Sequence, residues 1–320
     1  MSRWILNIDR WEMKSKEYEL EWYHGVRQTS SLKIFLFENI FRDEVFFRKT
    51  RRKKEDFIMK EKTNYGNWVP EKALYLLFGL AGVFLVVTVL LGVMVQIPVI
   101  TVIAGVVCAL TFAMAVYMLV CHEAFAFGKG NMMAGVHKHL VEHLDWDGEG
   151  KMLDIGCGAA ALTVRCAKAF PKAQITAMDY WGAEWSYAKE QCERNVRLES
   201  VADRVSFQKG DAAKLDFADE TFDAAVSNFV FHEVRSTKDK RNVVREALRV
   251  VKKGGVFSFQ DMFSQKALYG DMDAFVEVLK AEGISEIHYI GDLEKKLDFI
   301  PGFVTTPWMI SGMGILYGKK

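Results

Sequence analysis

The sequence has no Asp, Glu, Lys or Arg between Lys72 and Glu123, although charged residues make up 26% of the chain. This uncharged stretch consists of two apolar runs, 73–95 and 99–121, with Pro98 at the break between them. Each run exceeds the roughly 20 residues that a helix needs to cross the hydrocarbon core of a bilayer. Proline lacks a backbone N–H and disfavours helix at the residue before it. We therefore predict a hairpin of two transmembrane helices. A re-entrant element and a pair of buried core helices in a soluble protein are the alternatives.

Cysteine is also scarce, and its pattern excludes a disulfide framework. The chain has five cysteines, an odd number, and no two of them form a C-x-x-C pair. This pattern is typical of reduced, intracellular cysteines. The cysteines are Cys108, Cys121, Cys157, Cys166 and Cys192.

A broad basic surface is missing from the C-terminal part of the chain. The formal net charge is only +1, and residues 122–320 contain more acidic than basic residues. Phosphate binding needs a basic face, so we expect no nucleic-acid partner. The densest basic run, 48–54, precedes the first apolar run. The positive-inside rule then places both termini and the C-terminal domain in the cytoplasm, and the same basic run can contact anionic lipid headgroups.

The apolar runs and the patterns around them divide the chain into four parts. An aromatic-rich segment over 31–47 suits either an interfacial amphipathic helix or packing on the domain that follows the spans. We therefore expect an N-terminal cytoplasmic or interfacial segment, two transmembrane helices, a connecting helix and a C-terminal domain. Their predicted bounds are 1–72, 73–121, 122–147 and 148–320.

The C-terminal domain has the pattern of a doubly wound α/β fold. Short apolar runs alternate with helical stretches, which is typical of a mostly parallel sheet covered by helices. Ligands of such sheets bind at the carboxyl ends of the strands, near the point where the strand order reverses. We expect the last two strands to pair antiparallel. The predicted strands are 151–156, 173–179, 204–211, 222–229, 254–263, 285–291 and 314–320.

The stretch "LDIGCGAAAL" joins the first of these strands to a helix. Its glycines, Gly156 and Gly158, let the backbone approach a ligand closely. The spacing also fits the fingerprint of dinucleotide-binding sites, which is weak evidence alone. However, Asp154 precedes the first glycine by two residues and would repel a phosphate. The motif therefore favours a cationic or amine-bearing ligand over a nicotinamide dinucleotide.

This motif resembles motif I of the class I S-adenosylmethionine-dependent methyltransferases, whose pattern is acidic-x-G-x-G-x-G. The resemblance extends over about residues 128–320 and is to small-molecule enzymes of the ubiquinone, sterol and general bacterial type. It implies that Asp179 binds the ribose hydroxyls, that Asp211 meets the adenine amino group and that Asn228 lines the pocket. Ala160 stands where the family has its third glycine, and we expect this small residue to be tolerated. The transmembrane hairpin is outside the common family pattern.

The resemblance gives a set of candidate site residues around S-adenosylmethionine. The candidate cofactor-binding residues are Asp154, Gly156, Cys157, Gly158, Asp179, Tyr180, Asp211, Ala212 and Asn228. His232 is the one histidine near the expected reaction centre, and we name it as the candidate catalytic residue. A base with a near-neutral pKa would assist O- or N-methylation. A place in the pocket wall is the alternative for this side chain.

Three further histidines occur in "HKHLVEH", where His139 and His143 share a helical face. Such a pair can bind a metal ion, but no third ligand follows at a suitable spacing. We predict no metal site and expect a solvated helix face. The helix itself is expected to cover the cofactor, as the leading helix of the family does.

These observations together predict a membrane-anchored methyltransferase that uses S-adenosylmethionine. Its expected partners are the membrane and a small methyl acceptor, which we predict to be a lipid or another lipophilic molecule. A non-enzymatic membrane scaffold with the same fold, and a methyltransferase of a soluble metabolite, are the alternatives. No catalytic triad is present, and none is needed, because the cofactor carries an activated methyl group and the protein has mainly to align the reactants.

Overall fold

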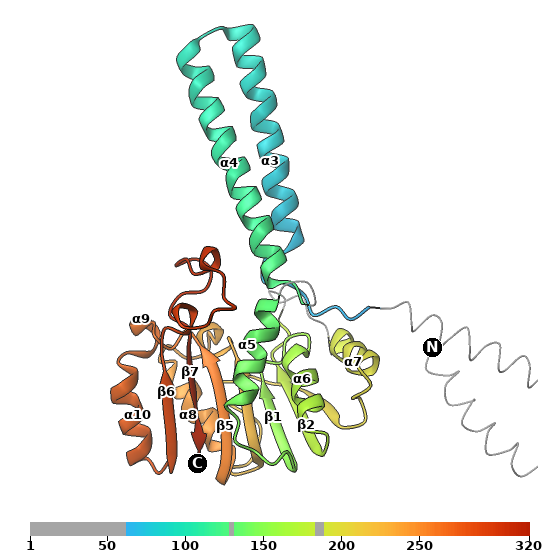
Figure 1. The fold of residues 1–320 in the computed structure, drawn as a ribbon, viewed down its shortest axis with the longest axis vertical. Helices are drawn as coiled ribbons and strands as arrows, with labels where there is room; N and C mark the ends of the chain where they lie inside the picture. Colours follow the sequence, from blue (N-terminus) through green and yellow to red (C-terminus); the bar gives the residue numbers. More distant parts are fainter. Residues whose placement is uncertain (1–61, 128–130, 183–188) are drawn as a thin grey trace, which may run out of the picture. The chain divides into compact units, whose positions relative to one another are not determined.

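The structure is a computed structural model, and it describes residues 62–127, 131–182 and 189–320 (Figure 1). The aromatic segment over 31–47 and the basic run over 48–54 lie outside the described residues.

The uncharged stretch forms two helices joined by a tight break. Helix α3, Glu71–Leu90, continues into a π-helical turn, η1, over Leu91–Val95, and α4 spans Pro98–Phe125. Between them Gln96 has a left-handed backbone with φ of 53°, and Pro98 occupies the first turn of α4. Proline fits there because the first helical N–H groups have no intrahelical acceptor. The predicted break is therefore present, and α4 runs one turn beyond the predicted end.

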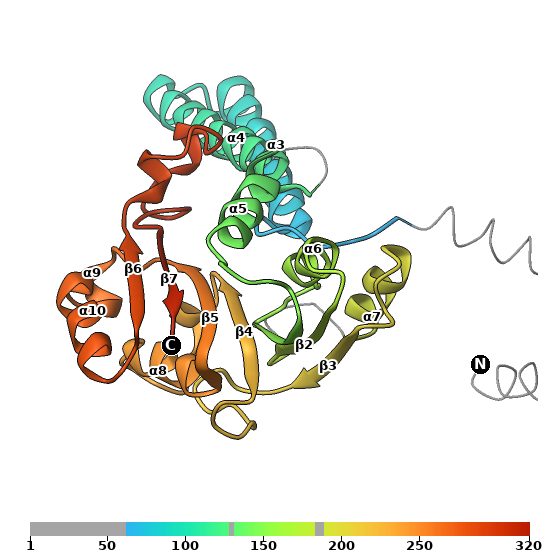
Figure 2. The same ribbon diagram turned by 60° about the horizontal axis from the view of Figure 1, so that its bottom comes forward.

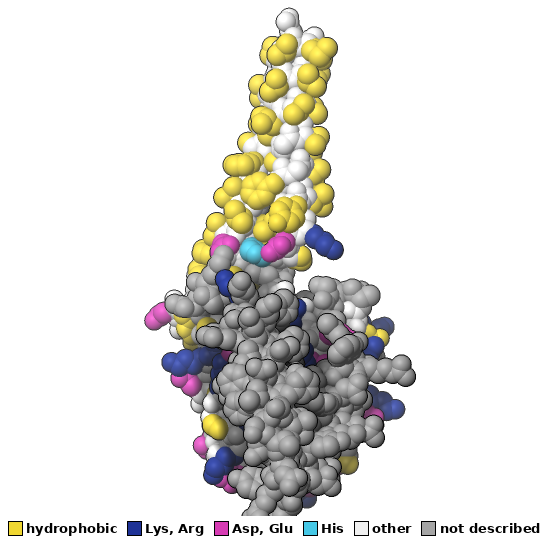
Figure 3. All heavy atoms as spheres, turned by 90° about the vertical axis from the view of Figure 1, so that its right-hand side faces the viewer, with side chains coloured by type: hydrophobic (Ala, Val, Ile, Leu, Met, Phe, Trp, Pro, Cys, Tyr) yellow, Lys and Arg dark blue, Asp and Glu magenta, His cyan; other side chains and the backbone are white. Residues whose placement is uncertain are grey.

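The surface of these helices is apolar and open. Both are long and apolar enough to cross a membrane, and only 6% of the most apolar window of each is buried. Met94 and Tyr75 are 75% and 72% exposed. Figure 3 shows hydrophobic side chains along the length of the hairpin. The core helix of a soluble protein would instead be mostly buried, so this exposure does not fit that alternative.

The C-terminal domain is built on a seven-stranded sheet in the described part of the chain, with the strand order β3-β2-β1-β4-β5-β7-β6. Strand β1 pairs in parallel with β2 on one side and β4 on the other, so the order reverses there. Strand β7 is antiparallel to both β5 and β6. All seven predicted strands are present, with the last two antiparallel as expected. The strands are β1 Gly150–Ile155, β2 Ala173–Asp179, β3 Val205–Lys209, β4 Phe222–Asn228, β5 Val251–Asp261, β6 Glu286–Ile290 and β7 Gly314–Lys319.

Helices cover both faces of this sheet (Figures 1 and 2). Apolar side chains of α5, α6 and α7 form one core cluster with β1 and β2, and those of α8 and α10 form another with β4 and β5. The burial of Val243, Val244, Ala247 and Leu248 along one side of α8 shows the spacing of an amphipathic helix. The helices are α5 Asn131–Glu142, α6 Ala161–Ala169, α7 Lys189–Leu198, α8 Arg241–Arg249, α9 Lys266–Tyr269 and α10 Met272–Ala281. The short 3₁₀ turns are η2 Phe231–Glu233, η3 Leu293–Lys295 and η4 Gly302–Val304.

The base of the hairpin packs against the domain. A further core cluster joins Leu74 of α3 and Phe125 of α4 to residues of α5 and to the segment between β6 and β7. The segment before α3 is also fixed to the domain, because Asn64 N–H donates to Asn195 Oδ1 at 3.0 Å and Asn195 Nδ2 donates to Asn64 O at 2.7 Å. Residues 62–70, which the sequence pattern assigns to the N-terminal segment, therefore contact α7 of the domain.

Candidate active site

A cavity of about 800 Å³ lies at the carboxyl ends of β1, β2 and β4. This is the edge of the sheet where the strand order reverses, as expected for a doubly wound fold. Of the ten predicted site residues, nine line the cavity. They are Gly156, Cys157, Gly158, Asp179, Tyr180, Asp211, Ala212, Asn228 and His232.

The glycine loop between β1 and α6 is wound tightly against β2. The N–H groups of Gly156 and Cys157 both donate to Met178 O, at 2.7 and 3.0 Å. Gly156 has a φ of +75°, and a Cβ at this position would lie 2.2 Å from Cγ2 of Val230. Both the backbone conformation and the available space therefore require glycine. Ala160 adopts the left-handed conformation with φ of 68°, a conformation that glycine adopts without steric cost.

Asp179 ties the end of β2 to this loop. Its Oδ2 accepts from Gly158 N–H at 2.8 Å, and its Oδ1 accepts from Trp181 N–H at 2.9 Å. Burial raises the pKa of Asp179, while the hydrogen bonds from these N–H groups lower it, and the net direction is upward. The carboxylate is thus held rigidly at the cavity wall, where a carboxylate can accept from two neighbouring hydroxyl groups.

Asp154 lies beneath the glycine loop and does not line the cavity. It is fully buried, and its Oδ2 accepts from Thr163 Oγ1 at 2.5 Å. Its Oδ1 has no hydrogen-bond partner among the described residues. Burial raises the pKa of Asp154 to about 7. The structure therefore places this carboxylate as a support for the loop, one layer below the position where direct ligand contact would occur.

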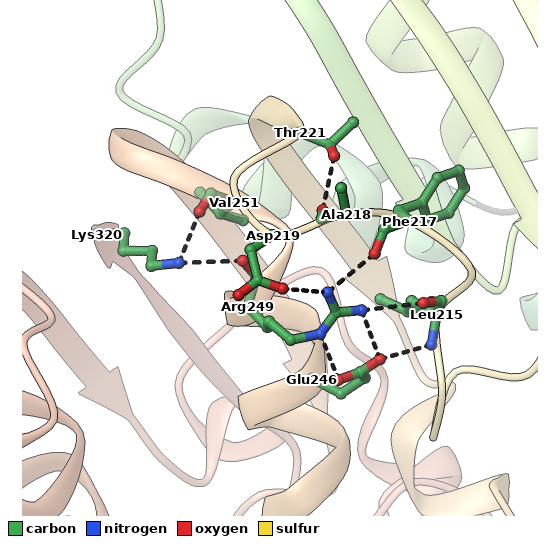
Figure 4. A network of polar contacts seen from close by, with 9 residues as sticks. All are labelled: Leu215, Phe217, Ala218, Asp219, Thr221, Glu246, Arg249, Val251 and Lys320. Carbon is green, nitrogen blue, oxygen red and sulfur yellow. Dashed lines mark hydrogen bonds and ion pairs between the residues drawn. The ribbon is translucent and has the colours of Figure 1, made fainter.

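The loop between β3 and β4 carries Asp211 and Ala212 to the cavity and is fixed by Arg249 of α8 (Figure 4). The guanidinium of Arg249 donates to Leu215 O and Phe217 O, each at 2.9 Å. The same guanidinium donates to both carboxylate oxygens of Glu246, whose Oε1 also accepts from Leu215 N–H at 2.7 Å. Planar, bidentate contacts of this kind are strongly directional. They give the loop a defined position relative to the sheet.

Asn228 ends β4 beside the glycine loop. Its Oδ1 is buried and has no hydrogen-bond partner among the described residues. Buried polar atoms are nearly always paired, so an acceptor without a donor at a cavity wall indicates a place for a ligand donor or an ordered water.

His232 is held between two carboxylates. Its Nδ1 lies 2.7 Å from Asp261 Oδ1, and its Nε2 lies 3.3 Å from Glu233 Oε1. Burial lowers the pKa of His232, but the charge and hydrogen bond of Asp261 and the contact with Glu233 outweigh it and raise the pKa to about 10. This pKa lies above the near-neutral range that would suit a general base. A charged imidazolium with both N–H groups engaged donates hydrogen bonds and has no free nitrogen to accept a proton.

The histidines of α5 also differ from the expectation. His137 is 4% exposed and lines the cavity, where burial lowers its pKa to about 3. His139 and His143 are half-buried, with ring centroids 4.3 Å apart. The face is thus packed rather than solvated. The described residues contain no group of three or more metal-ligating side chains close enough to hold an ion.

Sequence patterns missed the apolar part of the cavity wall. This part comes from the segment before α3, the end of α4 and the residues just after it, the loops after β4 and β5, and the segment between β6 and β7. Its residues include Tyr65, Trp68, Phe125, Phe127, Phe229, Met262, Trp308 and Met309. Asp261, the partner of His232, was also missed, although a carboxylate that ends a parallel strand is a recognisable signal.

A family model described as a methyltransferase domain matches residues 153–259. This match covers less than half of the chain. The matched range begins in β1, contains the glycine loop and ends in β5. The rest of the cavity wall, including the base of the hairpin, lies outside it.

The chain is also similar to curated proteins and to solved structures. The sterol 24-C-methyltransferase of Aspergillus fumigatus is 29% identical over 136 residues, which are 42% of this chain and 34% of that protein. The ubiquinone/menaquinone biosynthesis C-methyltransferase of Desulfotalea psychrophila is 30% identical over 108 residues, 34% of this chain and 39% of that protein. The chain thus spans less than half the length of these relatives. Phosphoethanolamine N-methyltransferase 2 of Haemonchus contortus, solved with S-adenosyl-L-methionine, aligns with a TM-score of 0.44 at 16% identity, over 58% of this chain and 52% of that one.

The residues of the cavity fit S-adenosylmethionine. The glycine loop presents Gly156, Cys157 and Gly158 to the cavity, so a ligand there can approach the loop closely. The carboxylate of Asp179 suits a pair of hydroxyl groups, and the unpartnered Oδ1 of Asn228 suits an amine. The cavity of about 800 Å³ lies within the range of roughly 300–1,000 Å³ that is typical of ligand pockets, so it has space for a cofactor.

Proposed function

We propose that this protein is a membrane-anchored methyltransferase that acts on a small lipophilic molecule at the cytoplasmic face of the membrane. One observation carries this proposal: the candidate cofactor residues and the aromatic base of the apolar hairpin line the same cavity. A scaffold that only retained the fold would not need this shared cavity. The names of two relatives, a sterol and a quinone-pathway methyltransferase, support an acceptor of this kind.

The residues of the domain would bind and position the cofactor, which supplies an activated methyl group on a sulfonium. In this proposal Asp179 and Asp211 hold the nucleoside, the glycine loop provides close backbone contact, and Asn228 receives the amine. The apolar wall excludes water and aligns the acceptor. Alignment of reactants in this way can contribute on the order of 7–11 kcal/mol to lowering the barrier. His232 would hold a polar group of the acceptor through its Nε2–H once Glu233 moves away, while Nδ1–H stays with Asp261.

The role of Asp179 gives a first prediction. The Asp179→Ala variant should bind S-adenosylhomocysteine more weakly by about 1.5–3 kcal/mol, the scale for hydrogen bonds to a charged group. Isothermal titration calorimetry measures this directly. Asp203→Ala is the matched control, because the side chain of Asp203 is 76% exposed and lies away from the cavity lining. Unchanged affinity in Asp179→Ala, or tighter binding of NADH than of S-adenosylhomocysteine to the native protein, would contradict the assignment.

The proposed membrane topology gives a second prediction. Both helices cross the bilayer in this proposal, because each uncharged run is long enough and its apolar surface is exposed. A cysteine tag at either terminus should then resist a membrane-impermeant thiol reagent in intact cells and react once the cells are opened. A cysteine placed at Gln96, in the break between the helices, is the control that should react from outside. Labelling of either terminus in intact cells would overturn this topology.

The acceptor class is tested with the full-length protein in a lipid nanodisc. A truncation through residue 121 is unsuitable, because it would remove Tyr65 and Trp68 from the cavity wall. Methyl-labelled cofactor is supplied with the lipid extract or with the water-soluble extract of the cells that make the protein. We expect label in the lipid extract. Label only in the water-soluble extract would favour a soluble metabolite, and no label with either would favour the scaffold.

A further inference from the structure

The cavity has an apolar compartment whose walls come from the base of the hairpin and from a loop of the domain. We propose that this compartment holds the hydrocarbon chain of the methyl acceptor and opens toward the bilayer, so that the acceptor is methylated while its chain remains in contact with lipid. This inference rests on the proposed function. It adds where the hydrocarbon chain of the acceptor binds and that this chain enters the cavity from the side of the bilayer.

The first wall is a group of three aromatic rings. The ring centroid of Trp68 lies 5.1 Å from the ring centroid of Phe125, which is at the end of α4. The same centroid lies 4.8 Å from the ring centroid of Phe229, and these two rings are in an edge-to-face contact. Phe229 directly follows Asn228, so the aromatic wall begins beside the predicted cofactor end of the cavity. Paired aromatic rings of this kind are rigid and apolar, which suits a hydrocarbon chain.

The second wall is the loop between η3 and β7, whose two ends are hydrogen-bonded to each other. The buried carboxylate of Glu294 accepts from Gly312 N–H and Met313 N–H, each at 2.9 Å. Leu293 N–H also donates to Met313 O at 2.8 Å. Between these anchors the loop contributes Trp308 and Met309 to the cavity lining. The loop is thus a built part of the cavity.

The same loop reaches the uncharged part of α4. The hydroxyl of Tyr117 donates to Phe303 O at 3.0 Å and lies 3.2 Å from Thr306 Oγ1. Tyr117 belongs to the uncharged run of α4, near the end of that run that leads into the domain, so the loop lies at the level of the domain end of the apolar helix. If α4 spans the membrane, the loop lies at the membrane interface.

The composition of the loop between η3 and β7 suits a position at the membrane interface. Residues 299–313 include no charged side chain. Trp308 is 67% exposed and Phe303 is 40% exposed, although both are large and apolar. Aromatic side chains are enriched where a protein meets the headgroup region of a bilayer. Trp308 is therefore both an exposed aromatic at the bilayer level and a lining residue of the cavity, which places the opening of the compartment toward the lipid.

The test uses a long-chain alcohol that carries a diazirine within its chain, dissolved in nanodiscs that contain the full-length protein. After illumination, mass spectrometry locates the cross-links. Lipid-exposed residues of α3 and α4 should be labelled in any case and act as the internal control. We expect additional cross-links at Phe229 and Met262, which line the cavity.

Two tryptophan variants on the same loop sharpen the test. Met309→Trp narrows the compartment, and labelling of Phe229 should be lost. Phe303→Trp is the matched control, because Phe303 lies on the loop outside the cavity lining and labelling should persist. Binding of S-adenosylhomocysteine is measured for each protein. Failure of this binding in the native protein would overturn the proposed function. Normal binding with cross-links confined to α3 and α4, or equal labelling of Phe229 in both variants, would overturn the compartment alone.

Discussion

Replacing Gly156 by alanine is expected to abolish measurable binding of S-adenosylhomocysteine. The φ of +75° at this position costs an L-residue about 1–2 kcal/mol. The added Cβ would also lie 2.2 and 2.4 Å from the two Cγ atoms of Val230. Overpacking of this kind typically costs about 1–3 kcal/mol, because backbone and side chains must shift. The loop that carries Cys157 and Gly158 would move with it, so we expect at least roughly a hundredfold loss of affinity, equivalent to about 3 kcal/mol.

Two further variants separate the clash from the backbone strain. Gly283→Ala is the strain control, because Gly283 has φ of +103° and nothing lies within 4 Å of its Cβ position. It should lower stability slightly and leave binding unchanged. Val230→Ala makes room for the new methyl group, so the Gly156→Ala/Val230→Ala double variant should recover part of the lost affinity. Calorimetry that finds native affinity in Gly156→Ala, or no coupling in the double variant, would refute the steric explanation.

The sheet and the glycine loop were predictable because their determinants are local. Each strand carries its own run of β-favouring apolar residues, and "LDIGCG" contains both the end of β1 and the turn that follows it. The acidic residues at Asp179 and Asp211 could be placed in the same cavity because parallel strands present their carboxyl ends at one edge. The tight break before α4 was predictable from Pro98, whose effect on the backbone is also local.

The apolar half of the cavity could not be predicted, because its residues meet only in the folded chain. Trp68 and Trp308 line the same cavity although they are far apart in sequence. The raised pKa of His232 also depends on a residue from another strand, because its partner Asp261 ends the neighbouring strand β5. Ala160 stands at the position where the sequence motif would have a third glycine. Its left-handed backbone is a conformation that glycine adopts without steric cost, and its full burial shows that the methyl group is packed into the core.

The motif identifies Asp154 as a site residue but does not show that its side chain is fully buried. This burial makes the stability of the folded protein depend on pH. An aspartate ordinarily titrates near 3.9, whereas burial raises the pKa of Asp154 to about 7. Between these two values the folded protein holds a proton that the unfolded chain has released. The free energy of unfolding must therefore fall as pH rises through this window. At about 1.36 kcal/mol for each unit of pKa, the contribution lost by pH 8 is on the order of 4 kcal/mol.

The Asp154→Asn variant isolates this contribution, because asparagine keeps the shape of the protonated carboxyl and does not ionise. Below about pH 4 the variant and the native protein should have similar stability. From pH 5 to pH 8 the variant should become progressively more stable than the native protein, with a difference in Tm on the order of 10 °C at the upper end. Thermal unfolding in detergent, followed by circular dichroism across this pH range, measures the difference.

Two controls test whether the effect belongs to this buried carboxyl. Asp203→Asn, at an exposed aspartate, should leave the pH profile unchanged. Thr163→Val removes the hydroxyl that donates to Asp154 Oδ2, a contact that lowers the pKa of Asp154. The loss of stability in Thr163→Val should therefore continue to a higher pH than in the native protein. Parallel profiles for the native protein and Asp154→Asn would show that Asp154 does not hold a proton in the folded state. In that case an unseen donor, such as an ordered water at Oδ1, must stabilise the charged carboxylate beneath the glycine loop.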